Sequence, residues 1–118
     1  RNRVQLIGNL GSQPQVKDFE NGKKLARFSL ATTDIYKKDG KYVRNTQWHN
    51  VTAWNKTVDI ILSREISTGS EIIVTGSIVS NSFTDKNGNE RTVSEIVADS
   101  IMVRKLSRAD AKIDKIRA

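Results

Sequence analysis

Strand-like segments make up most of residues 1–106, and only one stretch among them has helical spacing. Five segments, rich in β-branched and aromatic residues or alternating apolar with polar ones, span residues 4–16, 24–36, 46–54, 70–84 and 92–106. The sharpest turn signals between them are Asn21-Gly22, Asp39-Gly40 and residues 85–89. Val58, Ile61 and Leu62 recur at helical spacing, which predicts a helix over residues 56–66, closing at Gly69.

Five strands with one helix between the third and fourth is the order of an OB-fold. We therefore predict an all-β fold, a five-stranded Greek-key barrel with long hairpin loops, over residues 1–106. Glycines inside strand patterns suit the sharp bends that barrel closure requires, and they are Gly8, Gly11 and Gly76. Residues 107–118 form a short basic tail that can fold as a helix, with Ser107 and Asp110 as a capping pair.

The third strand carries both tryptophans of the chain. Alternation places four side chains on one face: Trp48, Asn50, Thr52 and Trp54. The other face suits a core and holds His49, Val51 and Ala53. At ~3.3 Å per residue the two indoles lie about 20 Å apart. Two flat rings on a polar face suggest a platform for nucleic acid bases, although a tryptophan can also close the end of a barrel.

Charge supports a polyanionic partner. The net charge is +7, and residues 1–56 carry 11 Lys or Arg against four Asp or Glu. Positive charge is thus concentrated in the half that holds both tryptophans, which favours nucleic acid. An anionic membrane surface fits less well, because no basic amphipathic helix accompanies the charge. A lysine-rich solvated surface without a partner is the plain alternative.

Further aromatic residues stand at strand ends next to cations. Tyr36 precedes Lys37 and Lys38, and Phe83 precedes the turn at residues 85–89. Other cations near the four rings in sequence are Lys41, Arg44, Lys56, Lys86 and Arg91. Single-stranded nucleic acid binds to this combination, since rings stack on bases and cations neutralise phosphates.

Catalysis and metal binding find little support. The chain has one histidine and no cysteine, so thiolate metal sites are excluded and no nucleophile–base pair is visible. Asp34, Asp39 and Asp85 would bind a cation only if folding brought them together. We expect no enzyme activity, no cofactor and no metal. No apolar run approaches a membrane span and no signal peptide opens the chain, so we expect no membrane association.

Many of these residues resemble those of the bacterial single-stranded DNA-binding protein family. The matching stretches are residues 4–11 with Pro14 and Val16, residues 28–32, residues 46–51, Gly69-Ser70, residues 74–76, and residues 84–91. They occur in order over nearly all of residues 3–104.

The resemblance implies roles for particular residues. The family's stacking aromatic positions fall on Tyr36, Trp48, Trp54 and Phe83. Lys56 matches a lysine that contacts the DNA backbone, and Arg3 matches a basic residue at the start of the first strand. His49 matches a histidine at a subunit interface, and the Asp39-Gly40 loop matches one that embraces DNA.

Some positions depart from the family pattern. Tyr36 and Phe83 stand where many relatives carry tryptophan, and Asn50 replaces a frequent arginine. The acidic-tipped tail that recruits replication and repair proteins in the family is absent, because this chain ends in the basic residues 112–117. Both a naturally short relative and a removed tail fit this ending.

The sequence as a whole predicts a non-enzymatic cytoplasmic protein, associated with the nucleoid, that binds and protects single-stranded DNA in replication, recombination and repair. The resemblance implies a homotetramer, with a dimer as the alternative. Two rival functions remain open: a dimeric OB-fold primosomal accessory protein and an OB-fold nuclease. RNA binding also remains open, because stacking does not read the 2′-hydroxyl.

Overall fold

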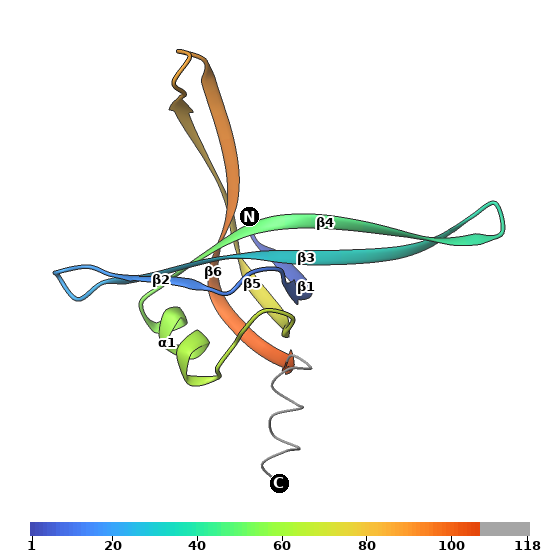
Figure 1. The fold of residues 1–118 in the computed structure, drawn as a ribbon, viewed down its shortest axis with the longest axis horizontal. Helices are drawn as coiled ribbons and strands as arrows, with labels where there is room; N and C mark the ends of the chain where they lie inside the picture. The colour runs from blue at the N-terminus through green and yellow to red at the C-terminus, as the bar shows by residue number, and fades with distance from the viewer. Residues whose placement is uncertain (107–118) are drawn as a thin grey trace, which may run out of the picture.

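The computed structural model describes residues 1–106 and shows a small barrel from which hairpins extend (Figure 1). In chain order the elements are β1 (Val4–Leu10), β2 (Gln15–Asp18), β3 (Lys24–Lys38), β4 (Lys41–Trp54), α1 (Lys56–Ser63), β5 (Glu71–Thr84) and β6 (Glu90–Lys105). The predicted capping pair of the tail lies outside the described residues.

The strands close into a barrel. The hydrogen-bonded order is β1-β5-β6-β4-β3-β2, and additional pairing of β1 with β3 at Asn9 and Leu10 completes the circle. β1 and β2 both pair antiparallel with β3 and are separated by the bend at residues 11–14, so they form one interrupted barrel strand. β4 and β6 pair in parallel. The predicted five-stranded OB-fold with one helix before the fourth barrel strand is therefore confirmed.

The core follows the alternation of the strands. Ala26, Phe28 and Leu30 alternate along β3 and are buried, and they pack with Val51 and Ala53 of β4. From β5 and β6 the core receives Ile72, Val74, Ile96, Ala98 and Ile101. Ile78 shares a face with Val74 by alternation but is 49% exposed, and it lies beyond Gly76, where the pairing of β5 with β1 ends.

Helix α1 ends earlier than predicted. The N–H of Ile66 donates to the carbonyl of Ile61, and the N–H of Glu65 donates to that of Leu62, which is a Schellman ending. Glu65 takes the left-handed conformation, with φ of 53°, that the sequence pattern assigned to Gly69. The chain therefore turns after Ser63, so that Ile66 packs in the core and Leu62 is exposed.

Three hairpins project from the barrel, joining β2 to β3, β3 to β4, and β5 to β6 (Figure 1). The β3–β4 hairpin is paired without interruption out to Lys38 and Lys41, with Asp39 and Gly40 as its turn. The β5–β6 hairpin is paired out to Thr84 and Glu90. The β2–β3 and β3–β4 hairpins project in opposite directions, and the β5–β6 hairpin projects between them (Figure 1).

Candidate nucleic-acid interface

Strand β4 presents both indoles to solvent on one face. Trp48 is 64% exposed and Trp54 is 40% exposed, whereas Val51 and Ala53 are buried. The predicted alternation is therefore confirmed for these four residues. Thr52 was predicted on the polar face, but it is only 3% exposed, because its hydroxyl donates to the carboxylate of Glu95 on the neighbouring β6 at 2.9 Å.

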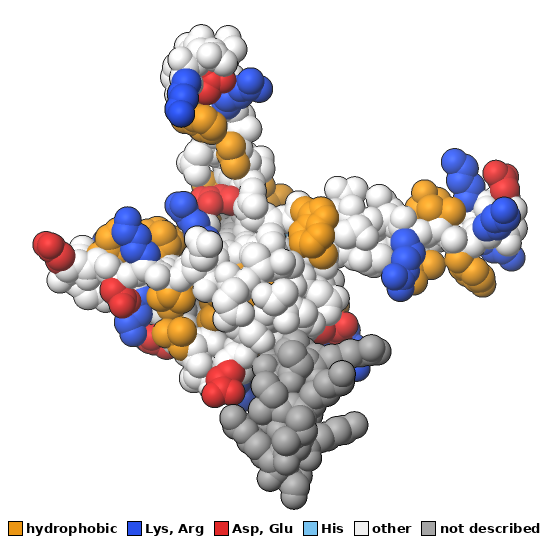
Figure 2. All heavy atoms as spheres, viewed as in Figure 1, with side chains coloured by type: hydrophobic (Ala, Val, Ile, Leu, Met, Phe, Trp, Pro, Cys, Tyr) orange, Lys and Arg blue, Asp and Glu red, His pale blue; other side chains and the backbone are white. Residues whose placement is uncertain are grey.

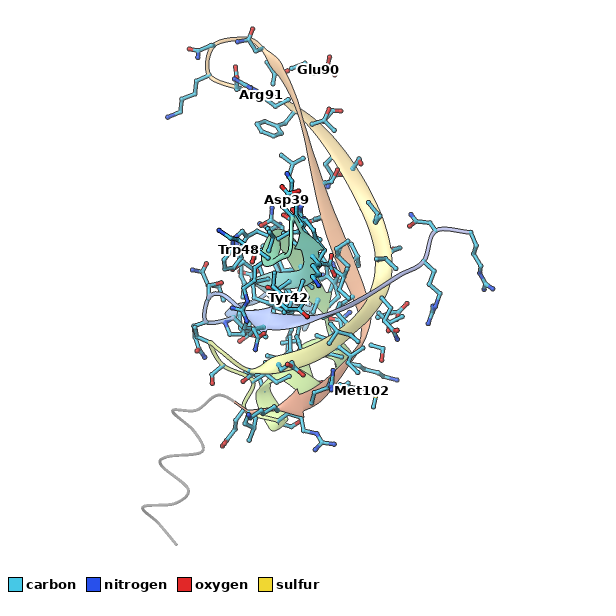
Figure 3. All side chains as sticks on the ribbon, turned by 90° about the vertical axis from the view of Figure 1, so that its right-hand side faces the viewer. Asp39, Tyr42, Trp48, Glu90, Arg91 and Met102 are labelled. Carbon is cyan, nitrogen blue, oxygen red and sulfur yellow. The ribbon has the colours of Figure 1, made fainter. Side chains whose placement is uncertain are left out.

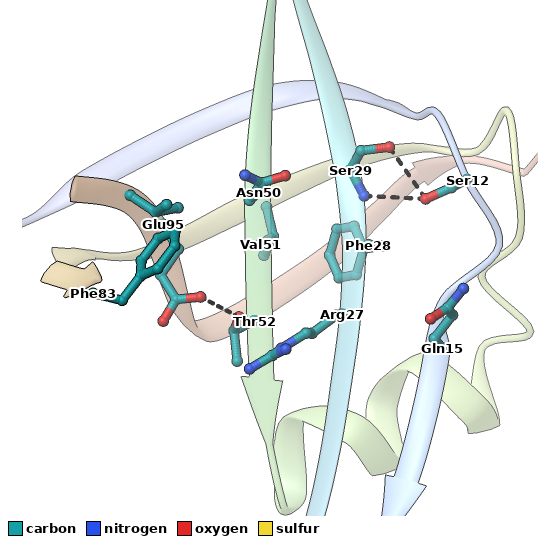
Figure 4. Close-up of a pocket in the computed structure, with 11 residues that line it drawn as sticks. Ser12, Gln15, Arg27, Phe28, Ser29, Asn50, Val51, Thr52, Phe83 and Glu95 are labelled. Carbon is teal, nitrogen blue, oxygen red and sulfur yellow. Dashed lines mark hydrogen bonds between the residues drawn. The ribbon is translucent and has the colours of Figure 1, made fainter. Parts of the chain in front are cut away.

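An open groove lies on this face, with a volume of about 590 Å³ (Figure 4). Its floor comes from β3 and β4, one wall from the β5–β6 hairpin and the other from the bend between β1 and β2. The lining residues are Ser12, Gln15, Arg27, Phe28, Ser29, Asn50, Val51, Thr52, Phe83, Val93 and Glu95. Asn50 and Thr52, which line the groove, stand between Trp48 and Trp54 along β4, and neither indole is part of the lining.

Phe83 reaches this groove from the β5–β6 hairpin. Its ring is 50% exposed and lines the groove together with Val93 and Glu95 of β6. A ring exposed to this extent in a groove keeps a free face on which a planar group can stack. The structure therefore brings Phe83 together with the face that carries Trp48 and Trp54.

Trp54 is supported by a ring that the sequence analysis missed. Phe19, in the turn between β2 and β3, stacks on Trp54 with ring centroids 6.2 Å apart and planes inclined by 21°. The ammonium of Lys17 lies 5.3 Å from the centroid of Phe19. Phe19 thus fixes one face of the Trp54 indole. The only sequence signal for Phe19 was its position beside the Asn21-Gly22 turn. A turn signal does not indicate which distant strand the turn contacts.

Trp48 lies over the bend between β1 and β2. Gly11 donates its N–H to the carbonyl of Ser29 at 2.9 Å, and a Cβ added at Gly11 would collide with the outer edge of the Trp48 ring. Because no side chain stands at Gly11, the indole can lie close to the barrel surface. The bend therefore sets the orientation of Trp48.

Replacing Gly11 by alanine is expected to displace the Trp48 ring without unfolding the protein. The obstacle is the far end of an exposed side chain, which rotates away at a loss of about 1 kcal/mol or less. We expect a shift of the Trp48 emission and altered quenching by iodide, measured in a Trp54→Phe background. Ser12→Ala, which adds no atom near the ring, is the control. An emission unchanged by Gly11→Ala would contradict this packing.

The β3–β4 hairpin carries a cluster of cations that we call the arm cations: Lys37, Lys38, Lys41 and Arg44. All four are exposed, and none of them forms an ion pair with any described residue. Lys38 and Lys41 are directly paired across the hairpin, so two like charges face each other at its tip. Figure 2 shows this concentration of basic side chains at the end of the hairpin.

Two tyrosines flank the arm cations. Tyr36 is 48% exposed and Tyr42 is 78% exposed, and the register places them on opposite faces of the hairpin. Figure 3 looks along this hairpin toward the barrel, with Tyr42 and Trp48 labelled. Alternation along β4 places Tyr42 on the same face as Trp48, so Tyr36 lies on the face away from the groove. Tyr42 is an exposed ring that the sequence analysis did not single out.

The remaining predicted cations differ in whether they form ion pairs. Arg91 donates to Asp85 at 2.9 Å, and this contact, helped by the backbone N–H groups of Asn89 and Asn87, holds the pKa of Asp85 below its usual range. Arg91 is thus partly neutralised, while Lys86 beside it is exposed. Arg3 lies 3.9 Å from Asp99, and Lys56 is exposed at the start of α1.

His49 and the predicted aspartates lie apart from the groove. His49 is half-buried, and its Nε2 forms a 2.9 Å hydrogen bond with the hydroxyl of Thr32. Asp34 and Asp39 belong to the β3–β4 hairpin and Asp85 to the β5–β6 hairpin. Among residues 1–106, no three His, Asp or Glu side chains gather where they could hold a metal ion. The single helix of this part of the chain is too short to cross a membrane.

Curated relatives were found over most of the chain. A single-stranded DNA-binding protein of Xylella fastidiosa strain Temecula1 is 40% identical over 103 residues, covering 86% of this chain and 62% of the relative. One from Neisseria meningitidis is 36% identical over 101 residues, covering 85% of this chain and 58% of the relative. This chain thus spans about three fifths of the length of both relatives. Single-stranded DNA-binding protein 1 of Xylella fastidiosa strain 9a5c is 35% identical over 118 residues and is itself 86% covered.

Two solved structures share the fold. An SSB of Plasmodium falciparum in complex with ssDNA superposes with a TM-score of 0.77 at 23% identity, covering 87% of this chain and 94% of that one. A deletion mutant of the Thermus aquaticus single-stranded DNA binding protein gives 0.74 at 21% identity, covering 89% and 51%. The model of the single-strand binding protein family matches residues 1–104. The chain therefore belongs to the single-strand binding protein family.

Proposed function

We propose that this protein binds single-stranded DNA without sequence specificity and protects it during replication, recombination and repair. The observation that carries the proposal is the exposure of Trp48 and Trp54 on one face of β4, beside a groove with Phe83 on its wall. Bases stack on these exposed rings, and every base has a face that can do so. Family membership and the relatives' names support the same conclusion.

The phosphates in this proposal are bound by the cations around the groove. Arg27 lines the groove itself, and the arm cations extend the positive surface along the β3–β4 hairpin. Tyr36 stacks a further base on the other face of this hairpin, which it shares with Lys38 and Lys41. Lys86 and Arg91 contribute from the β5–β6 hairpin, and Arg3 and Lys56 from the barrel. Contacts of this kind release counterions, so binding weakens as salt increases.

Tryptophan fluorescence during titration with poly(dT), repeated over a range of salt, tests the proposal. Strong quenching, with an affinity that falls as salt rises, is the expected result, because stacked bases quench indoles. An unchanged signal and no binding at low salt would show that Trp48 and Trp54 face solvent for another reason.

Trp54→Ala is expected to weaken binding of poly(dT) by ~1–3 kcal/mol, the range for loss of one stacked base. The free energy of unfolding should fall by only ~0.5–1.5 kcal/mol. The indole is already 40% exposed, so its removal mainly eliminates the stacking with Phe19. Affinity is measured by fluorescence anisotropy of labelled DNA, and stability by denaturant unfolding. Leu62→Ala, an exposed apolar residue on α1, is the control. If Trp54→Ala no longer unfolds cooperatively, the indole is mainly structural.

We also propose that the protein is a homo-oligomer, a tetramer rather than a dimer. Ile7, Ile73 and Met102 stand side by side across β1, β5 and β6, and Ile7 and Met102 are 47% and 63% exposed. The edge of β1 away from β5 has no strand partner over residues 4–8 within the described chain. A second copy would cover both features, and the half-buried His49 belongs to the proposed interface. Native mass spectrometry distinguishes tetramer, dimer and monomer.

The rival functions separate in simple assays. A primosomal accessory protein would be a dimer in the same native mass measurement. A nuclease would cleave DNA incubated with a divalent cation, whereas the protein proposed here has no catalytic activity and needs no cofactor. RNA and DNA are compared in one competition titration. Binding to unwound DNA would place the protein at the nucleoid, in the cytoplasm, beside replication and repair proteins.

A further inference from the structure

The groove contains one acidic side chain among its lining residues, Glu95 of β6. One carboxylate oxygen, Oε2, accepts a 2.9 Å hydrogen bond from the hydroxyl of Thr52, which is almost completely buried. The other, Oε1, accepts a 3.4 Å hydrogen bond from the side-chain amide of Asn81. The carboxylate is half-buried and held in place by groups on both neighbouring strands, so it is not a freely rotating surface charge.

Glu95 is directed toward Phe83. Val79 of β5 lies opposite Glu95. It shares one face of β5 with Asn81 and Phe83, because alternate residues of a strand point to the same side. Since Asn81 stands between Val79 and Phe83, its hydrogen bond turns the carboxylate toward the ring. In Figure 4 the carboxylate lies between Phe83 and Thr52.

A negative charge in a groove that binds a polyanion repels phosphates, which makes a purely electrostatic role unfavourable. Arg27 lies opposite Thr52 on β3, lines the same groove, and forms no ion pair with any described residue. The groove therefore offers a cation for a phosphate and, separately, a fixed hydrogen-bond acceptor for another part of the nucleotide. The base edge is the part that carries hydrogen-bond donors.

Resting on the proposed function, we propose that Glu95 contacts the edge of the base that stacks on Phe83 and favours an exocyclic amino group there over thymine. A carboxylate only accepts hydrogen bonds, and the N4 amino group of cytosine is a donor that glutamate and aspartate read in other complexes. Thymine has no amino group, and its N3–H lies between two carbonyl oxygens that repel a carboxylate. Glu95 thus gives a base preference to a site whose stacking is otherwise tolerant.

The test compares oligo(dC) with oligo(dT) of equal length, by quenching of tryptophan fluorescence, for the wild type and Glu95→Gln. Glutamine both donates and accepts, so it pairs with either base. We expect the ratio of the Kd for dT to the Kd for dC to fall by about fivefold, the lower end of the range for one base contact. Glu90→Gln is the control, because Glu90 is an exposed carboxylate on the same strand, outside the groove lining.

A second variant guards against a folding defect. Glu95→Asp keeps the charge but draws the carboxylate back toward β6, and it should lose the same discrimination while still unfolding cooperatively, at a small loss of stability from the weakened bond to Thr52. An unchanged ratio in both folded variants would overturn the inference. Equal tightening of dC and dT binding by Glu95→Gln beyond that of Glu90→Gln would also overturn it, because Glu95 would then only repel phosphates. Failure of the wild type to bind either oligonucleotide would instead refute the proposed function.

Discussion

Replacing Lys37, Lys38 and Lys41 together by glutamine is expected to weaken single-stranded DNA binding at least about tenfold near 0.1 M salt. The three ammonium groups are exposed at the outer end of the β3–β4 hairpin and make no ion pair with any described residue. Their charge is therefore available to phosphates. For single strands each phosphate contact contributes about 0.7 to the slope of log K against log salt, so the slope should fall by up to ~2.

A triple variant with the same change of charge provides the control. Arg64, Arg104 and Lys105 lie after α1 and at the end of β6, away from the groove and the hairpin. If the hairpin binds DNA locally, replacing these three by glutamine changes affinity far less. Equal losses in the two triple variants would mean that the net charge attracts DNA without local contacts.

Local alternation made the central part of the site predictable from the sequence. Along β4 one face is buried against the core, so Val51 and Ala53 had to point inward, and Trp48 and Trp54 outward. Sharing a face did not guarantee burial beyond Gly76, where β5 no longer pairs with β1 and Ile78 is exposed.

Contacts between distant segments were not predictable. Phe19 and Trp54 meet because β2 and β4 flank β3 where Leu25 pairs with both Lys17 and Trp54, and no periodicity in the sequence encodes that register. Thr52 is buried because β6 pairs in parallel with β4 and brings Glu95 over it. The ending of α1 at Ser63 was missed because it depends on Glu65 in the left-handed conformation, which is uncommon for glutamate and which the sequence pattern assigned to a glycine.

Gly76→Ala is expected to destabilise the barrel by about 3 kcal/mol or more, which is a large part of the stability of a small domain. Gly76 lies at an irregularity between β5 and β6, and a Cβ there would collide with the carbonyl group of Val97 and approach the Cα of Ala98 within 3.0 Å. Both obstacles are backbone atoms held in the sheet, so neither can rotate away. The strands would have to separate where Gly76 also pairs with Val4 of β1.

Gly11→Ala and Gly76→Ala differ in whether the added methyl group meets a side chain or the main chain. Each substitution adds one methyl group at a crowded glycine, but at Gly11 the obstacle is the exposed Trp48 ring, and at Gly76 it is the main chain of β6. Denaturant unfolding should therefore give a small loss for Gly11→Ala and a large one for Gly76→Ala. Because β5 and β6 continue into the hairpin that carries Phe83, a folded Gly76→Ala protein should also bind DNA more weakly. Similar stability for the two variants would show that β5 and β6 separate easily at Gly76, and that the wall of the groove is not fixed by the barrel.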